Sequence, residues 1–246
     1  MNEGNGTLAS DLASYKHAKV NATWDIKPKG NAYAFASNDY LELKNLSSVQ
    51  LTKNMDATIS FWIKTEKGQD ATLFSNGRGD ATDLEQSNGL RNKWAINMNS
   101  SGNLTFESEN VSYALTTKSV ADNGWHHIAL LLNRGGALKT YVDARQVSSN
   151  PITGIGGFSG NKAWLGARGH EDAMANKTVD RLFTGKLDEF RLWNSVREVK
   201  QISRDRFYEV DNQSAGLILY ARMNAPDPLT GNGPRYYYYE PTETAD

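Results

Sequence analysis

The carboxylates with a spacing suited to catalysis lie near the C-terminal end of the chain. Hydrolysis of a glycosidic bond needs two carboxyl groups, one on each side of the bond. A strand pattern that supplies them is Glu-x-Asp-x-x-Glu, and the nearest match is Glu209-Val210-Asp211-Asn212-Gln213-Ser214. Its last position is Ser, and it follows a predicted helix instead of lying in a central strand. We therefore expect no enzyme, and a glycoside hydrolase is the least favoured of three functions.

Two adjacent histidines, His126 and His127, could move protons or bind a metal. Neighbouring residues of a strand point to opposite faces of the sheet, so the pair cannot easily share one ion. We expect structural roles for both. The chain has no cysteine, which excludes disulfides and thiolate metal sites.

Composition excludes two classes of partner. The 246 residues carry a net charge of −1, with acidic and basic residues interspersed, so no basic block exists to bind nucleic acid. No run of 18 apolar residues occurs, so we expect no direct membrane insertion. The hydrophobic fraction of 39% is enough for one core at this length.

The elements that position these residues are predicted to be short strands. In Thr58–Lys64, Ile59, Phe61 and Ile63 share one face and polar residues the other. Similar strands are predicted at Tyr33–Phe35, Tyr40–Leu43, Ala71–Ser75, Trp94–Met98, Leu104–Glu107, His126–Leu132, Lys139–Val142, Ala163–Leu165, Gly185–Trp193 and Leu217–Met223. This pattern predicts an all-β, two-sheet antiparallel sandwich. Ser195 and Glu198 form a capping box, which predicts one helix over about Val196–Arg206.

Two long polar stretches, Asn76–Lys93 and Ala167–Leu182, are predicted to be irregular loops. Their mixed charged and amide side chains suit sugar hydroxyls, which both donate and accept hydrogen bonds. Trp94, at the end of the first loop, could stack on a sugar ring. The predicted ligand-binding residues are Arg78, Asp80, Asp83, Asn88, Trp94, Arg168 and Asp172.

An ordered series of segments resembles a known family. The segments are Gly30–Phe35 with Asp39–Leu43, Ala57–Lys64, Trp125–Ala129, Thr140–Asp143, Trp164–Gly166 and Phe183–Asn194. Together they resemble laminin G-like jelly-roll modules of the concanavalin A-like lectin/glucanase superfamily. The resemblance implies a non-catalytic binding module, with carbohydrate as the favoured ligand. The alternative is an accessory structural or adhesion domain that binds protein or only spaces its neighbours.

The same resemblance implies one structural Ca²⁺ at the rim of the sandwich. Asp11, after the opening turn, and Asp188, in Leu187-Asp188-Glu189-Phe190, match positions where such modules place carboxylates. A hard cation needs six to eight oxygen ligands. The run Asp11-Leu12-Ala13-Ser14 departs from the family's usual Ser-Gly-Asn sequence, which weakens the prediction.

The hairpin after the Tyr141-Val142 strand also departs from the family, which usually has Asp-Gly there. This chain has Asp143-Ala144. A turn that needs positive φ at both central residues disfavours Ala by about 1 kcal/mol. We therefore expect a different type of turn at this hairpin.

The two ends of the chain indicate a module cut from a longer protein. Asn2–Thr7 resembles the turn that opens such modules, and Leu217–Asn224 with Thr230–Gly233 resembles the preceding strand and the same turn again. We expect one domain over 1–225, and a linker or the start of a following module over 226–246. A tandem array of this kind indicates an extracellular or cell-surface protein, with a glycan or an extracellular protein as its partner.

Overall fold

The computed structural model describes residues 8–11, 16–19, 32–36, 38–44, 46–77, 93–108, 111–160, 162–171, 177–211, 214–223 and 235–238. The side chains of strands 8–11, 16–19 and 235–238, and of residues 170, 171 and 177, are not part of this description.

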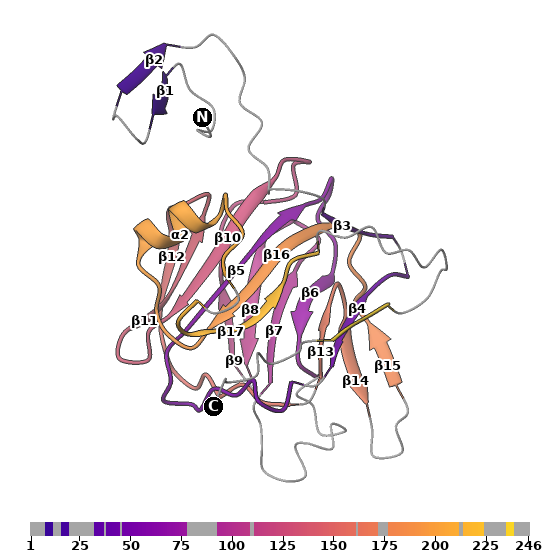
Figure 1. Ribbon diagram of the computed structural model, residues 1–246. Coiled ribbons are helices and arrows are strands. Elements are labelled where there is room, and N and C mark those ends of the chain that lie inside the picture. The colour runs from indigo at the N-terminus through magenta and orange to yellow at the C-terminus, as the bar shows by residue number, and fades with distance from the viewer. Residues whose placement is uncertain are drawn as a thin grey trace.

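Two seven-stranded sheets form the body of the molecule (Figure 1). The first, called the β10 sheet, has the order β12 (Arg145–Pro151), β11 (Ala137–Val142), β10 (His126–Leu132), β5 (Ala57–Lys64), β16 (Gly185–Trp193) and β17 (Leu217–Ala221), with β3 (Tyr33–Phe35) also paired to β16. The second, called the β7 sheet, has the order β18 (Arg235–Tyr238), β4 (Leu41–Lys44), β13 (Lys162–Leu165), β6 (Ala71–Ser75), β7 (Trp94–Met98), β8 (Leu104–Ser108) and β9 (Val111–Ala114).

The predicted two-sheet sandwich is confirmed. The strand pairs are antiparallel except for β18, which pairs with β4 in parallel. Two further hairpins pair only within themselves, β1 (Leu8–Asp11) with β2 (Lys16–Lys19) and β14 (Arg168–Glu171) with β15 (Lys177–Asp180). Strand β18 lies inside the segment 226–246, and the domain boundary at 225 stays a prediction.

Strand β5 is buried on both faces. Ile59, Phe61 and Ile63 point into the hydrophobic core between the two sheets, as the alternation predicted. On the opposite face, Thr58 and Trp62 are both fully buried. They are covered by the segment 195–207, since Thr58 bonds to Ser195 and Trp62 Nε1 donates to Arg206 O at 2.9 Å. This segment gives the β10 sheet a second, smaller buried layer on its outer face.

The helix begins three residues later than predicted. Helix α2 runs from Val199 to Asp205, with Glu198 as its N-cap, and Gln201 Oε1 accepts from Glu198 N at 2.9 Å. Ser195 is not the N-cap because the side chain of Thr58 in β5 forms hydrogen bonds with the backbone of Ser195 and Arg197. The Thr58 hydroxyl donates to Ser195 O at 2.8 Å and accepts from Arg197 N at 2.9 Å. The capping box forms instead between Glu198 and Gln201, three residues after the predicted one.

The predicted irregular loop at Ala167–Leu182 is wrong in part, because β14 and β15 form a hairpin within it. Arg168 and Asp180 face each other across this hairpin and form a two-point ion pair, with both N–O distances 2.8 Å. Gly169 is required where it is, because a Cβ there would lie 2.1 Å from the Trp164 ring. The hairpin is therefore fixed to β13 through Trp164.

The hairpin between β11 and β12 uses the turn that was judged unfavourable. Asp143 has φ of 52° and Ala144 has φ of 66°, so both central residues have positive φ, as in a type I′ turn. The expected change of turn type is therefore wrong. The Asp143 side chain stabilises the turn, because Oδ1 accepts from His127 N at 2.9 Å.

In the part of the chain that the structure describes, no helix is long and apolar enough to cross a membrane.

Candidate functional site

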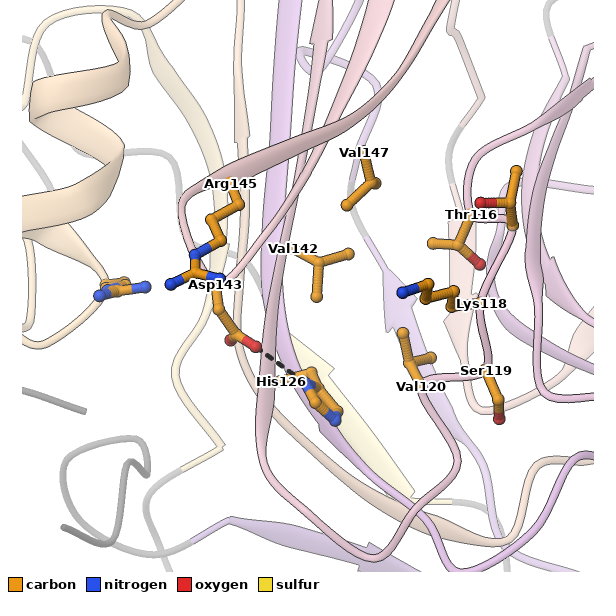
Figure 2. Close-up of a pocket in the computed structure, with 11 residues that line it drawn as sticks. Thr116, Lys118, Ser119, Val120, His126, Val142, Asp143, Arg145 and Val147 are labelled. Atoms are coloured by element: carbon orange, nitrogen blue, oxygen red, sulfur yellow. Dashed lines mark hydrogen bonds and ion pairs between the residues drawn. The ribbon is translucent and has the colours of Figure 1, made fainter. Parts of the chain in front are cut away.

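A cavity of about 740 Å³ opens at one edge of the sandwich. It lies between the connection from β9 to β10 and the β11–β12 hairpin, and we call it the edge pocket (Figure 2). Its lining residues are Thr116, Thr117, Lys118, Ser119, Val120, His126, Val142, Asp143, Arg145, Val147 and Arg206. A volume in this range accommodates a small ligand such as one or two sugar rings.

His126 stands at the base of the edge pocket between two carboxylates. Its Nδ1 lies 2.8 Å from Asp143 Oδ2, and its Nε2 lies 3.0 Å from Asp122 Oδ1. An ionised carboxylate only accepts hydrogen bonds, so both ring nitrogens must carry protons. The hydrogen bond to Asp143 is the main cause that raises the pKa of His126 to about 9. His126 is therefore a cation at neutral pH.

Ser119, His126 and Asp143 all line the pocket, which invites comparison with a hydrolase triad. A triad needs a neutral histidine whose free nitrogen takes the proton of the serine hydroxyl. Here Asp122 holds the second ring nitrogen of His126, and Ser119 Oγ instead accepts from Ala121 N at 3.1 Å. Ser119, His126 and Asp143 therefore do not have the arrangement of a triad.

Three further cations surround the pocket. Lys118 and Arg145 are exposed at its rim, and Figure 2 shows the Lys118 ammonium reaching toward Val142. Arg206 lines it from the segment after α2, and its Nε and Nη1 atoms have no hydrogen-bond partner among the described residues. Within that described part of the chain, none of the three forms an ion pair.

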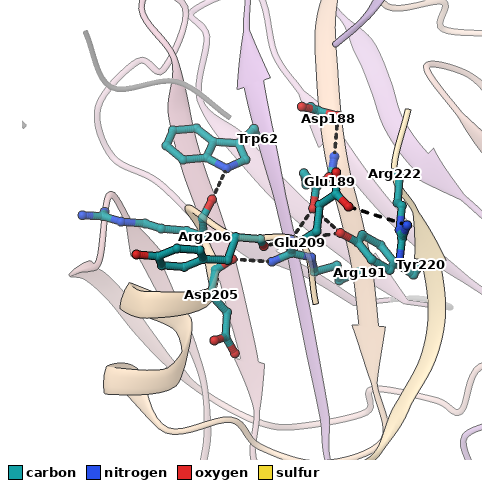
Figure 3. Close-up of polar contacts among 10 residues, drawn as sticks. Trp62, Asp188, Glu189, Arg191, Asp205, Arg206, Glu209, Tyr220 and Arg222 are labelled. Carbon is teal, nitrogen blue, oxygen red and sulfur yellow. Dashed lines mark hydrogen bonds and ion pairs between the residues drawn. The ribbon is translucent and has the colours of Figure 1, made fainter. Parts of the chain in front are cut away.

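The position of Arg206 is set by a buried polar network on the outer face of the β10 sheet (Figure 3). Its carbonyl accepts from Trp62 Nε1, and its guanidinium lies 4.4 Å from the centre of the Phe207 ring. Arg191 of β16 is 1% exposed and donates to Asp205 O at 2.8 Å and to Tyr208 O at 2.6 Å. Arg191 thus fixes the backbone on both sides of Arg206.

The same network contains two adjacent carboxylates, Asp188 and Glu189. A bulge in β16, with Glu189 at φ of 53°, lets Leu187 and Phe190 both face the core while the carboxylates face away from it. Glu189 bonds to Arg191 and to the Tyr220 hydroxyl. Asp188 and Glu189 are 0% and 3% exposed, so no substrate reaches them as a catalytic pair. Glu209 is exposed, lies 3.6 Å from Arg222 Nη1, and its charge helps to raise the pKa of Asp188 and of Glu189.

The predicted calcium ligand Asp188 has one oxygen suited to a cation. Its Oδ1 accepts from Glu189 N at 2.9 Å, whereas Oδ2 is buried without a partner among the described residues. Burial, with the neighbouring Glu189 charge, raises the pKa of Asp188 to about 8. Asp11 ends β1, and its side chain lies outside the described residues. The described residues hold no group of three or more acidic or histidine side chains placed for a metal.

The predicted ligand-binding residues are only partly visible. Arg78, Asp80, Asp83, Asn88 and Asp172 lie outside the described residues. Arg168 forms its ion pair with Asp180. Trp94 is 1% exposed, packs against Phe106 and Phe158, and donates from Nε1 to Gly156 O at 3.2 Å. Its ring belongs to the core and offers no surface to a ligand, so its predicted role in stacking is wrong.

Sequence reasoning missed the edge pocket because its residues come from three distant segments. The run Thr116-Thr117-Lys118-Ser119 is polar, but nothing in the sequence places it opposite Arg145 or Arg206. The one local signal is the pair Asp143 and His126, whose sequence context indicates a turn and a structural role. Both roles are present, and both residues also line the pocket.

Comparison with solved structures shows similarity to other jelly rolls. A candidate carbohydrate-binding protein from Bacteroides ovatus aligns with a TM-score of 0.61 and 19% identity, covering 86% of this chain and 56% of that one. Domain 4 of AbnA, an extracellular arabinanase from Geobacillus stearothermophilus solved with arabinotriose, aligns with a TM-score of 0.42 and 22% identity, over 62% of this chain and 66% of that one. The chain thus spans only about half of the first protein.

No curated protein matches the chain by sequence. A laminin G-type family model, described as "Concanavalin A-like lectin/glucanases superfamily", matches residues 35–203, which is more than half of the chain. The matched region runs from the end of β3 into α2 and so includes most strands of both sheets. The chain therefore belongs to the laminin G-type family of the concanavalin A-like lectin/glucanase superfamily.

Proposed function

We propose that this chain is a non-catalytic glycan-binding module of a larger extracellular or cell-surface protein, and that the glycan binds in the edge pocket. The observation that carries the proposal is the pocket itself, with its volume of about 740 Å³ and its mixed lining. Hydroxyl and charged side chains serve sugar hydroxyls, and Val142 and Val147 serve the apolar faces of sugar rings.

The likeness to the Bacteroides ovatus protein supports the proposal at the level of the fold. The geometry of His126 supports a binding role over an enzymatic one, because a histidine held between two carboxylates is not a base at neutral pH. The earlier prediction, which places the ligand at the loops Asn76–Lys93 and Ala167–Leu182, is a competing location for the same function.

A glycan array tests the function, and one substitution tests the site. Thr117 is exposed in the pocket lining, so Thr117→Trp fills the pocket without touching the core. We expect array hits for the wild-type protein and at least tenfold weaker binding of those hits by Thr117→Trp. Ser112→Trp is the matched control, because Ser112 is exposed on β9 outside the pocket lining.

The other outcomes separate the alternatives. Hits that survive Thr117→Trp but are lost in Arg78→Ala or Asp83→Ala would place the site on the Asn76–Lys93 loop. An array without hits would reject the glycan-binding function. It would leave the accessory domain, which binds protein or spaces neighbouring modules, as the surviving function.

A further inference from the structure

The charges of the edge pocket are unbalanced. Lys118, Arg145, Arg206 and His126 carry positive charge at neutral pH, against one carboxylate in the lining, Asp143. That carboxylate is already engaged, because Oδ2 bonds to His126 and Oδ1 to His127 N. Asp122 neutralises part of the His126 charge from outside the lining. The pocket therefore retains a net positive charge in a chain whose total charge is −1.

Arg206 makes this charge a fixed feature of the pocket. Burial lowers the pKa of Arg206, yet a guanidinium remains charged at any physiological pH. The network around Trp62 and Arg191 holds its backbone, and its Nε and Nη1 find no acceptor among the described residues. Asp143 is the carboxylate that acts on Arg206, but it forms no ion pair with Arg206 and already bonds to His126, so the guanidinium remains available to an anionic ligand.

The hydroxyl groups are oriented in a way that also suits an anion. Thr116 Oγ1 accepts from Leu104 N at 2.9 Å, and Ser119 Oγ accepts from Ala121 N at 3.1 Å. Each oxygen therefore receives its hydrogen bond from the backbone, and each hydroxyl proton is left to donate. The hydrogen bonds that these hydroxyls can donate suit the oxygens of a carboxylate, a sulfate or a sugar ring, because those oxygens are acceptors.

We propose that the edge pocket selects an acidic glycan, one whose sugar bears a carboxylate or a sulfate group. This inference rests on the proposed glycan-binding function and names the ligand class of the same site. Lys118 lies on one side of Val142 and Arg145 on the other (Figure 2), so an acidic group on either side meets a cation while the sugar ring lies over Val142 and Val147. Val147 is 40% exposed, so its side chain offers an apolar surface on which a sugar ring can lie.

Calorimetric titration with matched oligosaccharides tests the inference. The probes are tetragalacturonate, the same oligosaccharide with its carboxyl groups reduced to alcohols, a sulfated galactan tetrasaccharide, and inorganic sulfate. We expect at least one acidic oligosaccharide to bind tenfold more tightly than the reduced form, and salt to weaken that binding. Whichever acidic probe binds more tightly identifies the acidic group.

Charge-removing substitutions then connect the preference to the pocket. Lys118→Gln and Arg145→Gln, both at exposed positions, should each weaken binding of the acidic oligosaccharide about fivefold more than binding of the reduced form. Lys139→Gln is the control, because Lys139 is an exposed lysine of β11 outside the pocket lining, and it should change nothing.

Four outcomes would overturn the inference. Equal binding of the acidic and reduced oligosaccharides would retain the glycan-binding function but reject the preference for acidic glycans. Acidic binding that is unchanged in both pocket variants would place the site elsewhere. Inorganic sulfate that binds as tightly as the acidic sugars would indicate a simple anion site. Absence of binding to any oligosaccharide, acidic or neutral, would reject the glycan-binding function together with the inference.

Discussion

Asp143 shows how one residue can serve the turn, the strand and the pocket together. Its positive φ completes the turn between β11 and β12, and its Oδ1 accepts from His127 N. Its Oδ2 bonds to His126 and keeps that histidine charged. The family resemblance alone predicted a hairpin turn at Asp143. The bond to His126 could not be predicted, because it depends on where the two strands place their ends.

The charge of His126 gives a stability that depends on pH. Its pKa is raised from 6.5 to about 9 in the folded protein, so the folded state holds the proton more tightly than the unfolded chain. The contribution is complete below pH 6.5 and is lost as the pH rises through 9. The stability difference between wild type and His126→Gln should therefore shrink by on the order of 1–2 kcal/mol between pH 6 and 9.5.

Urea unfolding at a series of pH values measures this difference, and the subtraction removes the titration of groups common to both proteins. His127→Gln is unsuitable as a control because His127 is buried and stays neutral, with its pKa lowered by burial. A difference that is constant from pH 6 to 9.5 would show that Asp122 and Asp143 do not hold His126 in its charged form.

At the scale of elements, the period-two pattern predicted the core strands well because successive side chains of a strand point to opposite faces of the sheet. Strand β5 is buried on both faces, but its core face could still be recognised from Ile59, Phe61 and Ile63. The start of α2 was missed because Thr58, far away in sequence, bonds to the backbone near the predicted cap. The capping rule considers only residues that are close in sequence, whereas here Thr58 of another strand forms the hydrogen bonds at the predicted cap.

The β11–β12 turn carries a cost that one substitution should remove. Ala144 at φ of 66° is disfavoured by about 1–2 kcal/mol, whereas Gly adopts this conformation freely. The greater freedom of Gly in the unfolded chain offsets about 0.5–1 kcal/mol of that gain. We expect Ala144→Gly to stabilise the protein by about 0.5–1 kcal/mol, measured by thermal unfolding.

A second alanine provides the control for this substitution. Ala114 is exposed at the end of β9 and has no positive φ, so Ala114→Gly should destabilise the protein by about 0.5–1 kcal/mol. Equal destabilisation by both substitutions would contradict the view that the turn conformation at Ala144 is unfavourable.

At the scale of the whole molecule, the two sheets together form a pocket whose lining residues come from several separate elements. The edge pocket forms where β9, at the edge of the β7 sheet, leads into β10 of the other sheet. Arg206 reaches the pocket only because a segment 144 residues from Trp62 packs against the outer face of the β10 sheet. The sequence therefore predicted the fold and its family, and the site required the arrangement of both sheets.

Calcium binding is the prediction that concerns the stability of the whole sandwich. Asp188 lies on β16, which pairs with β3, β5 and β17, so an ion bound there would stabilise the β10 sheet as a unit. One site with free Ca²⁺ at 100 times its Kd contributes about 2.7 kcal/mol. For a domain of this size that corresponds to about 5–10 °C in Tm. We expect Ca²⁺ to raise Tm by this amount and chelator to reverse it.

Two variants connect such a shift to Asp188. Asp188→Asn keeps the oxygen that accepts from Glu189 N but cannot become the carboxylate that would bind the ion, so its Tm should no longer respond to Ca²⁺. Glu66→Gln removes an exposed carboxylate elsewhere on the surface and should respond as the wild type does. A shift of equal size in Asp188→Asn would place the ion at other residues, and a wild-type Tm unaffected by Ca²⁺ and chelator would reject the calcium site implied by the family resemblance.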